Sequence, residues 1–356
     1  MNTRAFLLLL LAAFLASCKN NPSEPNNPAP APNLAKAVYV LNEGDFSDPT
    51  GARLTIYDVQ KDSVYRDVYE GANGGSHLGN VGDDMKFYNG KAYIVMSGSK
   101  NLVVINLATN RKELEVGFPG SAVHDIVIDS VRSRLYLTRL FSSSVYVLNL
   151  NSLALIDSIA VGSNPQGMAI SNGKLFVCNS GYGSDSTVTI VDASTNRVLA
   201  TKTVGPGPTG AAVAPDGRVW ISCTGNPFST VPASGVIVIL DPQTNGVTDQ
   251  ISLGGSYLWG PISVASDGYA YLLGVTPGSF FGGPVHRVSL QSKSLTLDFI
   301  AGTFYGLAFD DVAREIYVSD ARDFLADGTV RIYTNAGALR KSFTAQKGPA
   351  VFSFKR

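Results

Sequence analysis

Apolar residues along the chain recur in short runs that turn residues separate, and four such runs repeat as a unit. The clearest copy covers residues 204–254. In it, Thr209–Ala214 and Val219–Ser222 are predicted strands, Gly235–Asp241 is a nearly continuous apolar third strand, and Val247–Leu253 alternates as a half-exposed fourth strand does. Four antiparallel strands in about 45 residues are typical of one propeller blade.

One blade cannot bury both faces of its sheet, so the unit must recur along the chain. The last apolar residue of the innermost strand recurs at separations of 41, 42, 43, 51, 45 and 45 residues, and these residues are Phe87, Ile128, Ile170, Val213, Val264, Phe309 and Phe354. The sequence therefore predicts an all-β fold, a seven-bladed β-propeller of four-stranded antiparallel blades. Asn-Gly or Asp-Gly pairs follow four of these residues and predict type I′ hairpin turns: Asn89–Gly90, Asn172–Gly173, Asp216–Gly217 and Asp267–Gly268.

The two ends of the repeat pattern are incomplete in complementary ways. Pro349–Arg356 supplies an innermost strand with no strands after it. Ala37–Leu41, Arg53–Asp58 and Ser63–Tyr69 supply a second, third and fourth strand with no first. We expect the C-terminal strand to complete the N-terminal blade, because this closure removes two open sheet edges.

The first 35 residues differ in composition from the rest of the chain. Residues 1–17 combine Arg4 with an apolar stretch over Phe6–Ala16, which predicts a signal peptide. Leu15–Cys18 resembles the lipoprotein box of bacteria, in which Cys18 would be lipidated; a plain signal peptide with an incidental cysteine is the alternative. Residues 18–35, with their Pro and Asn content, predict a disordered tether, and residues 36–356 a single propeller domain. Because Lys19 rather than Asp follows the cysteine, we expect an outer-membrane location on the periplasmic or cell-surface side.

Charge is sparse and balanced. The sequence has 28 basic and 28 acidic residues, 16% of the chain, against roughly 25% in an average soluble domain. No basic field is available to attract nucleic acid, so nucleic-acid binding is not expected.

Several stretches resemble the YVTN-type, YncE-like seven-bladed propellers of bacteria: residues 164–170 (NPQGMAI), 173–179 (GKLFVCN), 188–192 (VTIVD) and 204–205. Residues 39–44 (YVLNEG) and 124–128 (HDIVI) look like the subgroup found as surface lipoproteins of Bacteroidetes-type bacteria. The resemblance covers residues 37–356 and implies a propeller fold and export, but it implies little about function.

Four consecutive blades have long loops between their second and third strands, on the face where propellers usually bind. These loops are Thr224–Ser234, Thr276–Pro284, Ala321–Gly328 and Glu43–Ala52. We expect a lopsided aromatic wall there that binds a sugar or peptide, because exposed loop aromatics usually mark binding. The alternative is that these rings pack under their own loops. The wall residues are Phe46, Phe228, Phe280, Phe281 and Phe324, with Asp45 and Arg322 beside them.

A second candidate site is the mouth of the central channel. The residue four before each innermost-strand end is Asp83, His124, Gln166, Thr209, Gly260, Tyr305 or Ala350; Asp84 and Asp125 follow on two blades, and His77 precedes blade 2. His and carboxylate side chains near one axis could coordinate a metal, although the spacing is no known ligand motif. Propeller lactonases often have a glutamate-led cation site here, and this ring contains no Glu.

These observations favour a non-enzymatic, monomeric propeller, anchored to the outer membrane, that binds a protein, peptide or glycan and needs no cofactor. A hydrolase or lactonase with a metal at the channel mouth is one alternative, and a structural surface-layer protein is another. No nucleophile elbow or phosphate-binding loop is found. Cys178 and Cys223, at the ends of two second strands, are expected to be buried thiols rather than a disulfide.

Overall fold

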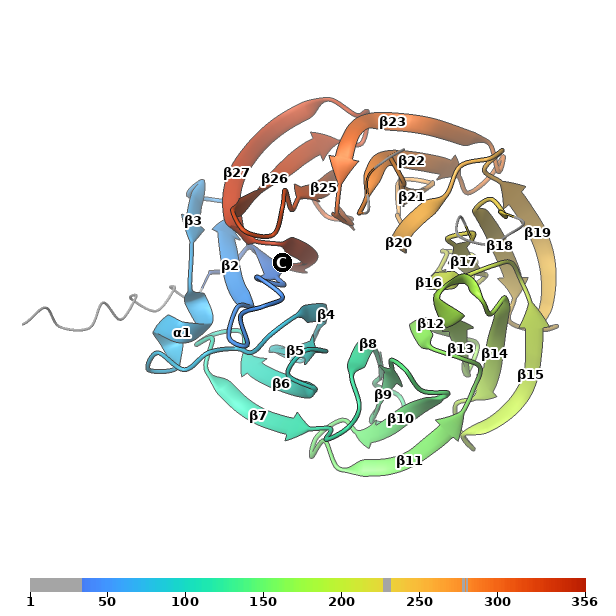
Figure 1. The fold of residues 1–356 in the computed structure, drawn as a ribbon, viewed down its shortest axis with the longest axis horizontal. Helices are drawn as coiled ribbons and strands as arrows, with labels where there is room; N and C mark the ends of the chain where they lie inside the picture. The colour runs from blue at the N-terminus through green and yellow to red at the C-terminus, as the bar shows by residue number, and fades with distance from the viewer. Residues whose placement is uncertain (1–33, 227–231, 277–278, 280) are drawn as a thin grey trace, which may run out of the picture.

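The computed structural model describes residues 34–226, 232–276, 279 and 281–356. It forms a ring of seven four-stranded antiparallel sheets around a central channel (Figure 1). The predicted all-β propeller is therefore confirmed. The helical elements among the described residues are one short α-helix, α1 (Val68–Ala72), and one 3-10 turn, η1 (Gly181–Gly183).

Blade 1 is built from both ends of the chain. Its strand order is β28-β1-β2-β3, with β28 (Pro349–Lys355) innermost, followed by β1 (Ala37–Asn42), β2 (Arg53–Asp58) and β3 (Ser63–Tyr65). In the antiparallel pair of β1 and β28, Ala37 lies opposite Lys355 and Asn42 opposite Pro349. The predicted closure by the C-terminal strand is confirmed.

The other six blades are continuous in sequence. Blade 2 contains β4 (Gly82–Tyr88), β5 (Lys91–Met96), β6 (Asn101–Asn106) and β7 (Lys112–Gly117). Blade 3 contains β8 (Val123–Asp129), β9 (Arg134–Arg139), β10 (Ser144–Asn149) and β11 (Leu155–Ala160). Blade 4 contains β12 (Pro165–Ser171), β13 (Lys174–Asn179), β14 (Thr187–Asp192) and β15 (Arg197–Thr203).

Blade 5 contains β16 (Pro208–Val213), β17 (Val219–Cys223), β18 (Val236–Asp241) and β19 (Gly246–Ser252). Blade 6 contains β20 (Leu258–Val264), β21 (Tyr269–Gly274), β22 (Gly283–Ser289) and β23 (Leu295–Phe304). Blade 7 contains β24 (Gly306–Asp310), β25 (Glu315–Asp320), β26 (Asp327–Thr334) and β27 (Leu339–Lys347).

The apolar core is divided among the blade interfaces. Seven clusters of buried side chains are found in the described residues, and each joins two neighbouring blades. The middle strands are buried on both faces, which explains their continuous apolar runs, whereas outer strands such as β15 have mostly exposed side chains. Each blade is therefore stabilised mainly by its two neighbours, so an open ring would expose two apolar faces.

Two details differ from the sequence-based predictions. At Asp216–Gly217 and Asp267–Gly268 only the glycine has a positive φ, and the N–H of Ala214 bonds to Arg218 O, so these connections are longer turns and the type I′ prediction is wrong for them. It holds for Asn89–Gly90 and Asn172–Gly173, where both residues have positive φ.

The fourth strand of blade 1 is also shorter than predicted. It ends at Tyr65, and α1 occupies the residues expected to extend it. The chain turns inward here because Val68 and Tyr69 are buried in the core between blades 1 and 2. Leu34, within the predicted tether, is buried in the same core.

Cys178 and Cys223 are both free and buried, and they lie in the same cluster between blades 4 and 5. The prediction of two buried thiols is confirmed. Burial raises the pKa of both thiols, so neither is activated as a nucleophile. No helix in the part of the chain that the structure describes has the length and apolar character needed to cross a bilayer.

Candidate functional site at the channel mouth

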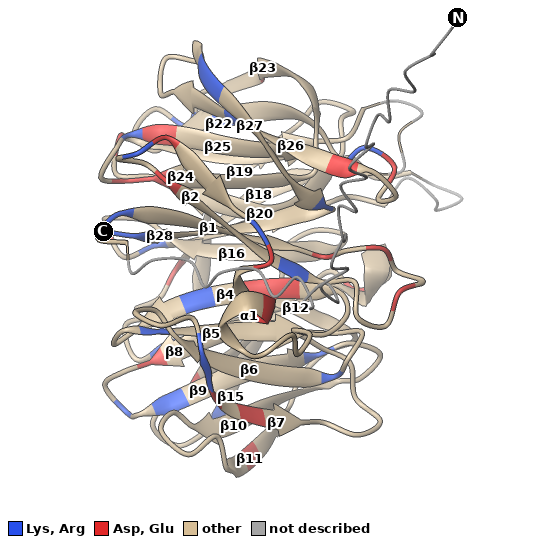
Figure 2. Cartoon of the chain, turned by 90° about the vertical axis from the view of Figure 1, so that its left-hand side faces the viewer, with Lys and Arg blue, Asp and Glu red and all other residues tan. Residues whose placement is uncertain are grey.

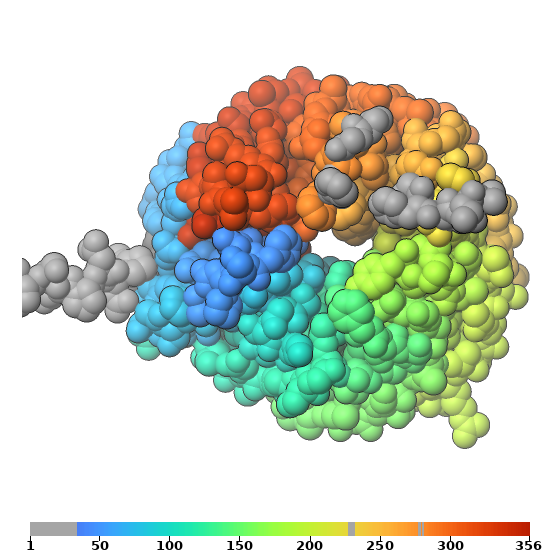
Figure 3. All heavy atoms as spheres, in the orientation of Figure 1, coloured from blue at the N-terminus to red at the C-terminus, as the bar shows by residue number. Residues whose placement is uncertain are grey.

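Two kinds of connection meet on one face of the ring, which is the face toward the viewer in Figure 3. These are the loops between second and third strands and the segments that lead from one blade into the innermost strand of the next. Backbone bonds join the two kinds: the N–H of Glu43, in the loop after β1, donates to Gly348 O just before β28. We call this face the long-loop face, and the central channel opens on it (Figure 3).

Five aromatic side chains from three consecutive blades pack together on this face, and we call them the aromatic cluster. Phe324 is its centre, with ring centroids 5.1 Å from Phe46, 5.6 Å from Phe281 and 5.0 Å from Tyr305. Trp259 extends the cluster, at 5.6 Å from Phe281 and 5.8 Å from Tyr305. Blades 6, 7 and 1 thus contribute to one aromatic surface.

The members of the cluster differ in exposure. Phe324 is buried, whereas Phe46 and Phe281 are 49% and 46% exposed. One ring therefore packs under its loop, as the alternative expected, while two others remain open to solvent. Phe228 and Phe280 lie outside the described residues.

The two charged residues expected beside this wall do not join the cluster through a side-chain contact that the structure shows. Asp45 accepts hydrogen bonds from the backbone N–H and the hydroxyl of Ser47, and these bonds lower the pKa of its carboxyl group. Arg322 is exposed, has a positive φ of 53°, and donates its backbone N–H to Asp320 Oδ1.

A buried carboxylate lies directly against the cluster. The Tyr305 hydroxyl donates to Glu43, with its oxygen 2.9 Å from Oε1 and 3.0 Å from Oε2. Burial, followed by the charge of Asp83, raises the pKa of Glu43 well above its ordinary value, and the bond from Tyr305 only partly offsets this. Glu43 comes from the loop after β1 and not from the ring of residues that precede the innermost-strand ends, so the sequence analysis did not include it.

Asp83 and His124 form a second pair at the mouth, on blades 2 and 3. Their nearest side-chain atoms, Asp83 Oδ1 and His124 Nε2, are 3.9 Å apart, and Asp83 Oδ2 accepts the N–H of Ser97 at 3.0 Å. Burial raises the pKa of Asp83 to about 6, although His124 and Ser97 favour its charged form. The channel mouth therefore has two carboxyl groups, Glu43 and Asp83, that are more easily protonated than ordinary ones.

Asp84 and Asp125 accept hydrogen bonds from the backbone of the next blade. Asp84 Oδ2 accepts the N–H of Ile126 in blade 3 at 3.1 Å, and Asp125 Oδ2 accepts the N–H of Met168 in blade 4 at 2.8 Å. Burial opposes ionisation of Asp84, but Lys86 and these hydrogen bonds keep its pKa low. Burial and the charge of Asp84 raise the pKa of Asp125. Both side chains link the innermost strands of adjacent blades.

The equivalent position in blades 4, 5 and 7 is glycine. A Cβ at Gly167, Gly210 or Gly306 would approach backbone atoms of the next blade to 2.5, 2.8 and 2.2 Å. The innermost strands therefore pack directly against each other there. Gln166, another predicted residue of the mouth, is half-buried on β12.

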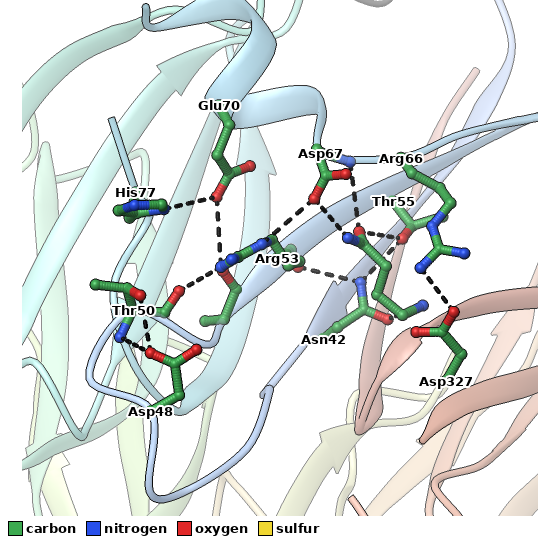
Figure 4. A network of polar contacts seen from close by, with 12 residues as sticks. Asn42, Asp48, Thr50, Arg53, Thr55, Arg66, Asp67, Glu70, His77 and Asp327 are labelled. Atoms are coloured by element: carbon green, nitrogen blue, oxygen red, sulfur yellow. Dashed lines mark hydrogen bonds and ion pairs between the residues drawn. The ribbon is translucent and has the colours of Figure 1, made fainter. Parts of the chain in front are cut away.

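His77 is placed in a different environment from the other predicted mouth residues. Its Nδ1 lies 3.9 Å from Glu70 Oε1 beside α1 (Figure 4). Arg53 lies between Asp67 and Glu70 in the same network, at 3.3 and 3.6 Å. Gln346 of β27 donates to Asp67 and accepts from Thr55, so this network joins blade 7 to blade 1 where the ring closes.

No group of three or more His, Cys, Asp or Glu side chains that could hold a metal ion is found among the described residues. Two hollows of about 300 and 250 Å³ lie between innermost strands of blades 2 and 3 and of blades 1 and 2, and residues such as Phe87, Ile128 and Phe354 line them. Neither hollow includes a residue of the aromatic cluster. The cluster is therefore a surface feature rather than the wall of either hollow.

A second group of exposed rings was not predicted. Phe141, after β9, and Tyr182, in η1, are 78% and 56% exposed, and their ring centroids are 5.8 Å apart. Both belong to second-to-third-strand loops, in blades 3 and 4. Loop length was the signal used for the aromatic wall, and it did not select these loops: residues 140–143 of blade 3 form a short loop, but residues 180–186 of blade 4 form a longer one than residues 321–326 of blade 7. An aromatic residue in the loop, whatever its length, would have identified them.

A family model described as "Domain of unknown function (DUF5074)" matches residues 36–347, which include every strand except β28. The chain belongs to the DUF5074 family. This DUF5074 chain has no match among curated proteins.

Solved structures share the fold of this DUF5074 protein. A quinonprotein alcohol dehydrogenase-like protein from Bacteroides thetaiotaomicron has a TM-score of 0.71 and 16% identity, over 92% of this chain and 79% of that one. A protein from Lactobacillus plantarum has a TM-score of 0.68 and 14% identity, over 90% and 99% of the chains. A chain of a mitotic checkpoint complex has a TM-score of 0.61 and 14% identity, over 89% and 96%. At such identities the likeness shows the fold alone.

Proposed function

We propose that this protein is an exported, lipid-anchored propeller that binds a ligand or protein partner on its long-loop face and catalyses no reaction. The observation that carries the proposal is the aromatic cluster, in which Phe46 and Phe281 are half exposed over the buried ring of Phe324. Aromatic side chains held on loops of a rigid scaffold are the usual means of recognition on such folds.

Charge around the cluster supports a ligand other than a phosphate. Glu43, which accepts from Tyr305, has a raised pKa. Asp45 and Asp323, next to Phe46 and Phe324 in the sequence, have lowered pKa values and stay charged. The arginine expected beside the cluster makes no contact with a cluster ring that the structure shows. Phosphate recognition usually enlists several arginines at close range. The face therefore suits a neutral ligand or the uncharged surface of a partner.

The anchor rests on the N-terminal sequence. Leu15–Cys18 has the pattern of a lipoprotein box after an apolar stretch, and the resemblance to YVTN-type propellers found as surface lipoproteins supports the same location. Two or more acyl chains on Cys18 would hold the protein stably on an outer membrane. Replacing Cys18 by Ser should then move the protein from the membrane to the soluble fraction. Unchanged fractionation, with no lipid mass on the mature N-terminus, would contradict the anchor.

The binding function is tested with glycan and protein arrays probed by the full-length protein in detergent. We expect a specific hit, and Phe46→Ala combined with Phe281→Ala should weaken it at least tenfold, because exposed aromatic anchors often contribute about 2 kcal/mol or more. Gln243→Ala with Thr244→Ala changes the β18–β19 turn on the opposite face and is the matched control. If only the Gln243→Ala, Thr244→Ala variant loses binding, the ligand site lies on the opposite face and the proposal is wrong.

A second candidate function is hydrolysis or lactone opening with a metal at the channel mouth. It has one observation in its favour, the approach of His124 to Asp83 beside the buried Glu43. Elemental analysis of the purified protein decides between the two functions. A stoichiometric metal that His124→Ala removes would favour the enzyme over the binding protein.

A further inference from the structure

We propose that Phe141 and Tyr182 form a second contact site on the long-loop face, and that the ligand is a neutral oligosaccharide reaching across the channel mouth. This inference rests on the proposed binding function and specifies its ligand class. We call Phe141 and Tyr182 the ring pair. In this inference the ring pair and the aromatic cluster, on the other side of the channel, contact the same ligand.

The first observation is the exposure of the two rings. Phe141 is 78% and Tyr182 56% exposed, and their planes are inclined by 36° at a centroid distance of 5.8 Å. Single exposed aromatics are common on soluble proteins, but two adjacent ones from different blades form a platform. The ring pair presents this platform to solvent beside the channel.

The second observation is the backbone beneath the rings. Phe141 has a φ of 55° and Tyr182 a φ of 52°, both in the left-handed region that favours Gly and Asn. Asparagine is the commonest non-glycine residue at such positions in the described chain, and large apolar residues there, such as Leu153 and Phe324, are buried in the fold. Neither the backbone nor the solvent favours a large aromatic side chain at residues 141 and 182. Contact with a bound molecule would explain why aromatic residues occur at these two positions, whereas the stability of the fold does not explain it.

The third observation is that hydrogen bonds fix both loops. The N–H of Phe141 donates to Asn164 Oδ1 at 2.5 Å. The N–H of Gly183 donates to Ser180 O at 2.8 Å, and the hydroxyl of Ser184 donates to Gly181 O at 2.6 Å. The backbone that carries the rings is therefore fixed before any ligand arrives, which lowers the entropy cost of binding.

The ring pair and the aromatic cluster lie on opposite sides of the channel. Blades 3 and 4 are across the ring from blade 7, which supplies Tyr305 and Phe324 (Figure 1). The pKa of Tyr182 is raised by burial and by the charge of Asp83, which is consistent with a phenol on the channel side of its loop. A ligand that contacts both groups must extend across the mouth, so it is longer than a monosaccharide.

The surroundings of the ring pair select the ligand class. Residues 140–144 (LFSSS) and 180–187 (SGYGSDST) contain hydroxyl groups and one carboxylate, and the neighbouring guanidinium of Arg139 is hydrogen-bonded to Ser144 Oγ. A sugar ring has an apolar C–H face that stacks on an aromatic ring and a hydroxyl edge that such polar groups can bind. A protein interface needs a contiguous apolar centre, whereas these two rings are surrounded by polar groups.

The test uses the full-length protein in detergent and a panel of neutral linear hexasaccharides of glucose, mannose, xylose and N-acetylglucosamine, measured by isothermal titration calorimetry. At least one should bind. Phe141→Gly with Tyr182→Gly should weaken that binding at least tenfold. The same change should leave the melting temperature equal or raise it by about 1–3 °C, because glycine relieves the left-handed backbone.

Arg314→Gly is the matched control. Arg314 is exposed and has a φ of 56°, in the connection between β24 and β25 on the opposite face. It should give the same small stabilisation and unchanged sugar binding, so it separates relief of backbone strain from loss of contact.

The outcomes separate this inference from the proposed function. If none of the hexasaccharides binds, or if the array identifies a charged or protein ligand, the oligosaccharide class is overturned. If Phe46→Ala with Phe281→Ala abolishes binding while the glycine double variant binds normally, the long-loop face binds but the ring pair takes no part. If neither pair of substitutions affects a ligand that does bind, both proposals fail.

Discussion

The phenol of Tyr305 is hydrogen-bonded to both carboxylate oxygens of Glu43, although the two residues are 262 positions apart in the chain. Tyr305 leads into the innermost strand of blade 7, and Glu43 follows β1 in blade 1. The bond therefore crosses the interface at which the ring closes. It also holds a buried carboxyl group under the aromatic cluster.

Replacing Tyr305 by Phe removes this bond and keeps the ring. We expect a loss of about 1–3 kcal/mol in the free energy of unfolding at pH 8, because a buried carboxylate loses its donor. At pH 4 the loss should be smaller, since the pKa of Glu43 is raised and its neutral form needs the donor less. Urea unfolding at both pH values measures this. An equal loss at both would mean that Glu43 is not the group responsible.

The carboxyl group of Asp83 should make stability fall as pH rises. Its pKa is about 6 in the fold against 3.8 ordinarily, so between these values the folded state retains a proton that the unfolded chain has lost. Ionising it costs on the order of 1–3 kcal/mol, a cost that is absent below about pH 4 and complete above about pH 6. His124, Ser97, Asp84 and Glu43 all act on this group.

Asp83→Asn should remove that cost. The melting temperature of the variant relative to the parent should increase between pH 4 and pH 7, and calorimetry in this range measures the difference. Glu113→Gln is the control, because Glu113 is paired with Lys91 on the outer strand β7 and its pKa is lowered. A constant difference between Asp83→Asn and the parent across the range would show that Asp83 has an ordinary pKa.

The aromatic cluster should separate binding from stability. Phe324 is buried among Phe46, Phe281 and Tyr305, so Phe324→Ala should cost about 3–5 kcal/mol of unfolding free energy. Phe46→Ala and Phe281→Ala should each cost about 1 kcal/mol or less, since half of each side chain is already in water. Urea unfolding of the three variants checks this ranking. A stable Phe324→Ala protein would contradict the packing described for the cluster.

The innermost strands pack differently in different blades. Removing a side chain in blade 2 and adding one in blade 5 should therefore both destabilise the fold. Asp84→Ala leaves the N–H of Ile126 without its acceptor and should cost about 1–3 kcal/mol. Gly210→Asp should cost about 2–4 kcal/mol, because its Cβ would meet Ile262 N at 2.8 Å and no room exists for the link that Asp84 makes in blade 2. Asp249→Ala, on the outer strand β19, is the control in chemical denaturation. Tolerance of Gly210→Asp would show that the strands can separate freely.

Deleting Pro349–Arg356 removes the innermost strand of blade 1 and exposes the apolar faces that β28 covers on β1 and at its neighbours. We expect aggregation or a cooperative loss of the folded state rather than the mild effect of trimming a frayed end. Light scattering and thermal melting measure it, and deletion of Arg356 alone is the control. A truncated protein that melts within about 2 °C of the parent would contradict closure by this strand.

The number of blades and their closure could be predicted because they depend on local patterns that every blade repeats. The apolar run of each innermost strand can be recognised from sequence alone. The C-terminal strand has no partner of its own and the N-terminal blade lacks its innermost strand, so the two are expected to pair. Turn type was harder to predict. Asp-Gly and Asn-Gly pairs are similar in sequence, but only in the Asn-Gly pairs do both residues have the left-handed backbone conformation here. The inward turn at α1 depends on the burial of Tyr69 in a neighbouring blade, which no local pattern records.

The site was predicted in part for the same reason. Phe46 and Phe281 lie on long loops, so loop length identified them, whereas the loop of Phe324, residues 321–326, is shorter than the predicted Ala321–Gly328. Glu43 reaches the mouth only through its bond to Tyr305, and Trp259 joins through ring contacts with Phe281 and Tyr305. Contacts between neighbouring blades, such as these with Tyr305, depend on how the blades pack and have no signature in any one repeat.

The register of β1 on β28 also gives the molecule a front and a back. Ala37 lies opposite Lys355, so the start of the folded chain and its C-terminal end share one side of the disc, whereas Asn42 and Pro349 lie at the side that carries the aromatic cluster. Figure 2 shows the C-terminus on the side away from the loops of the long-loop face. A support attached after Arg356 would therefore be joined to the back of the disc and would leave the front turned outward.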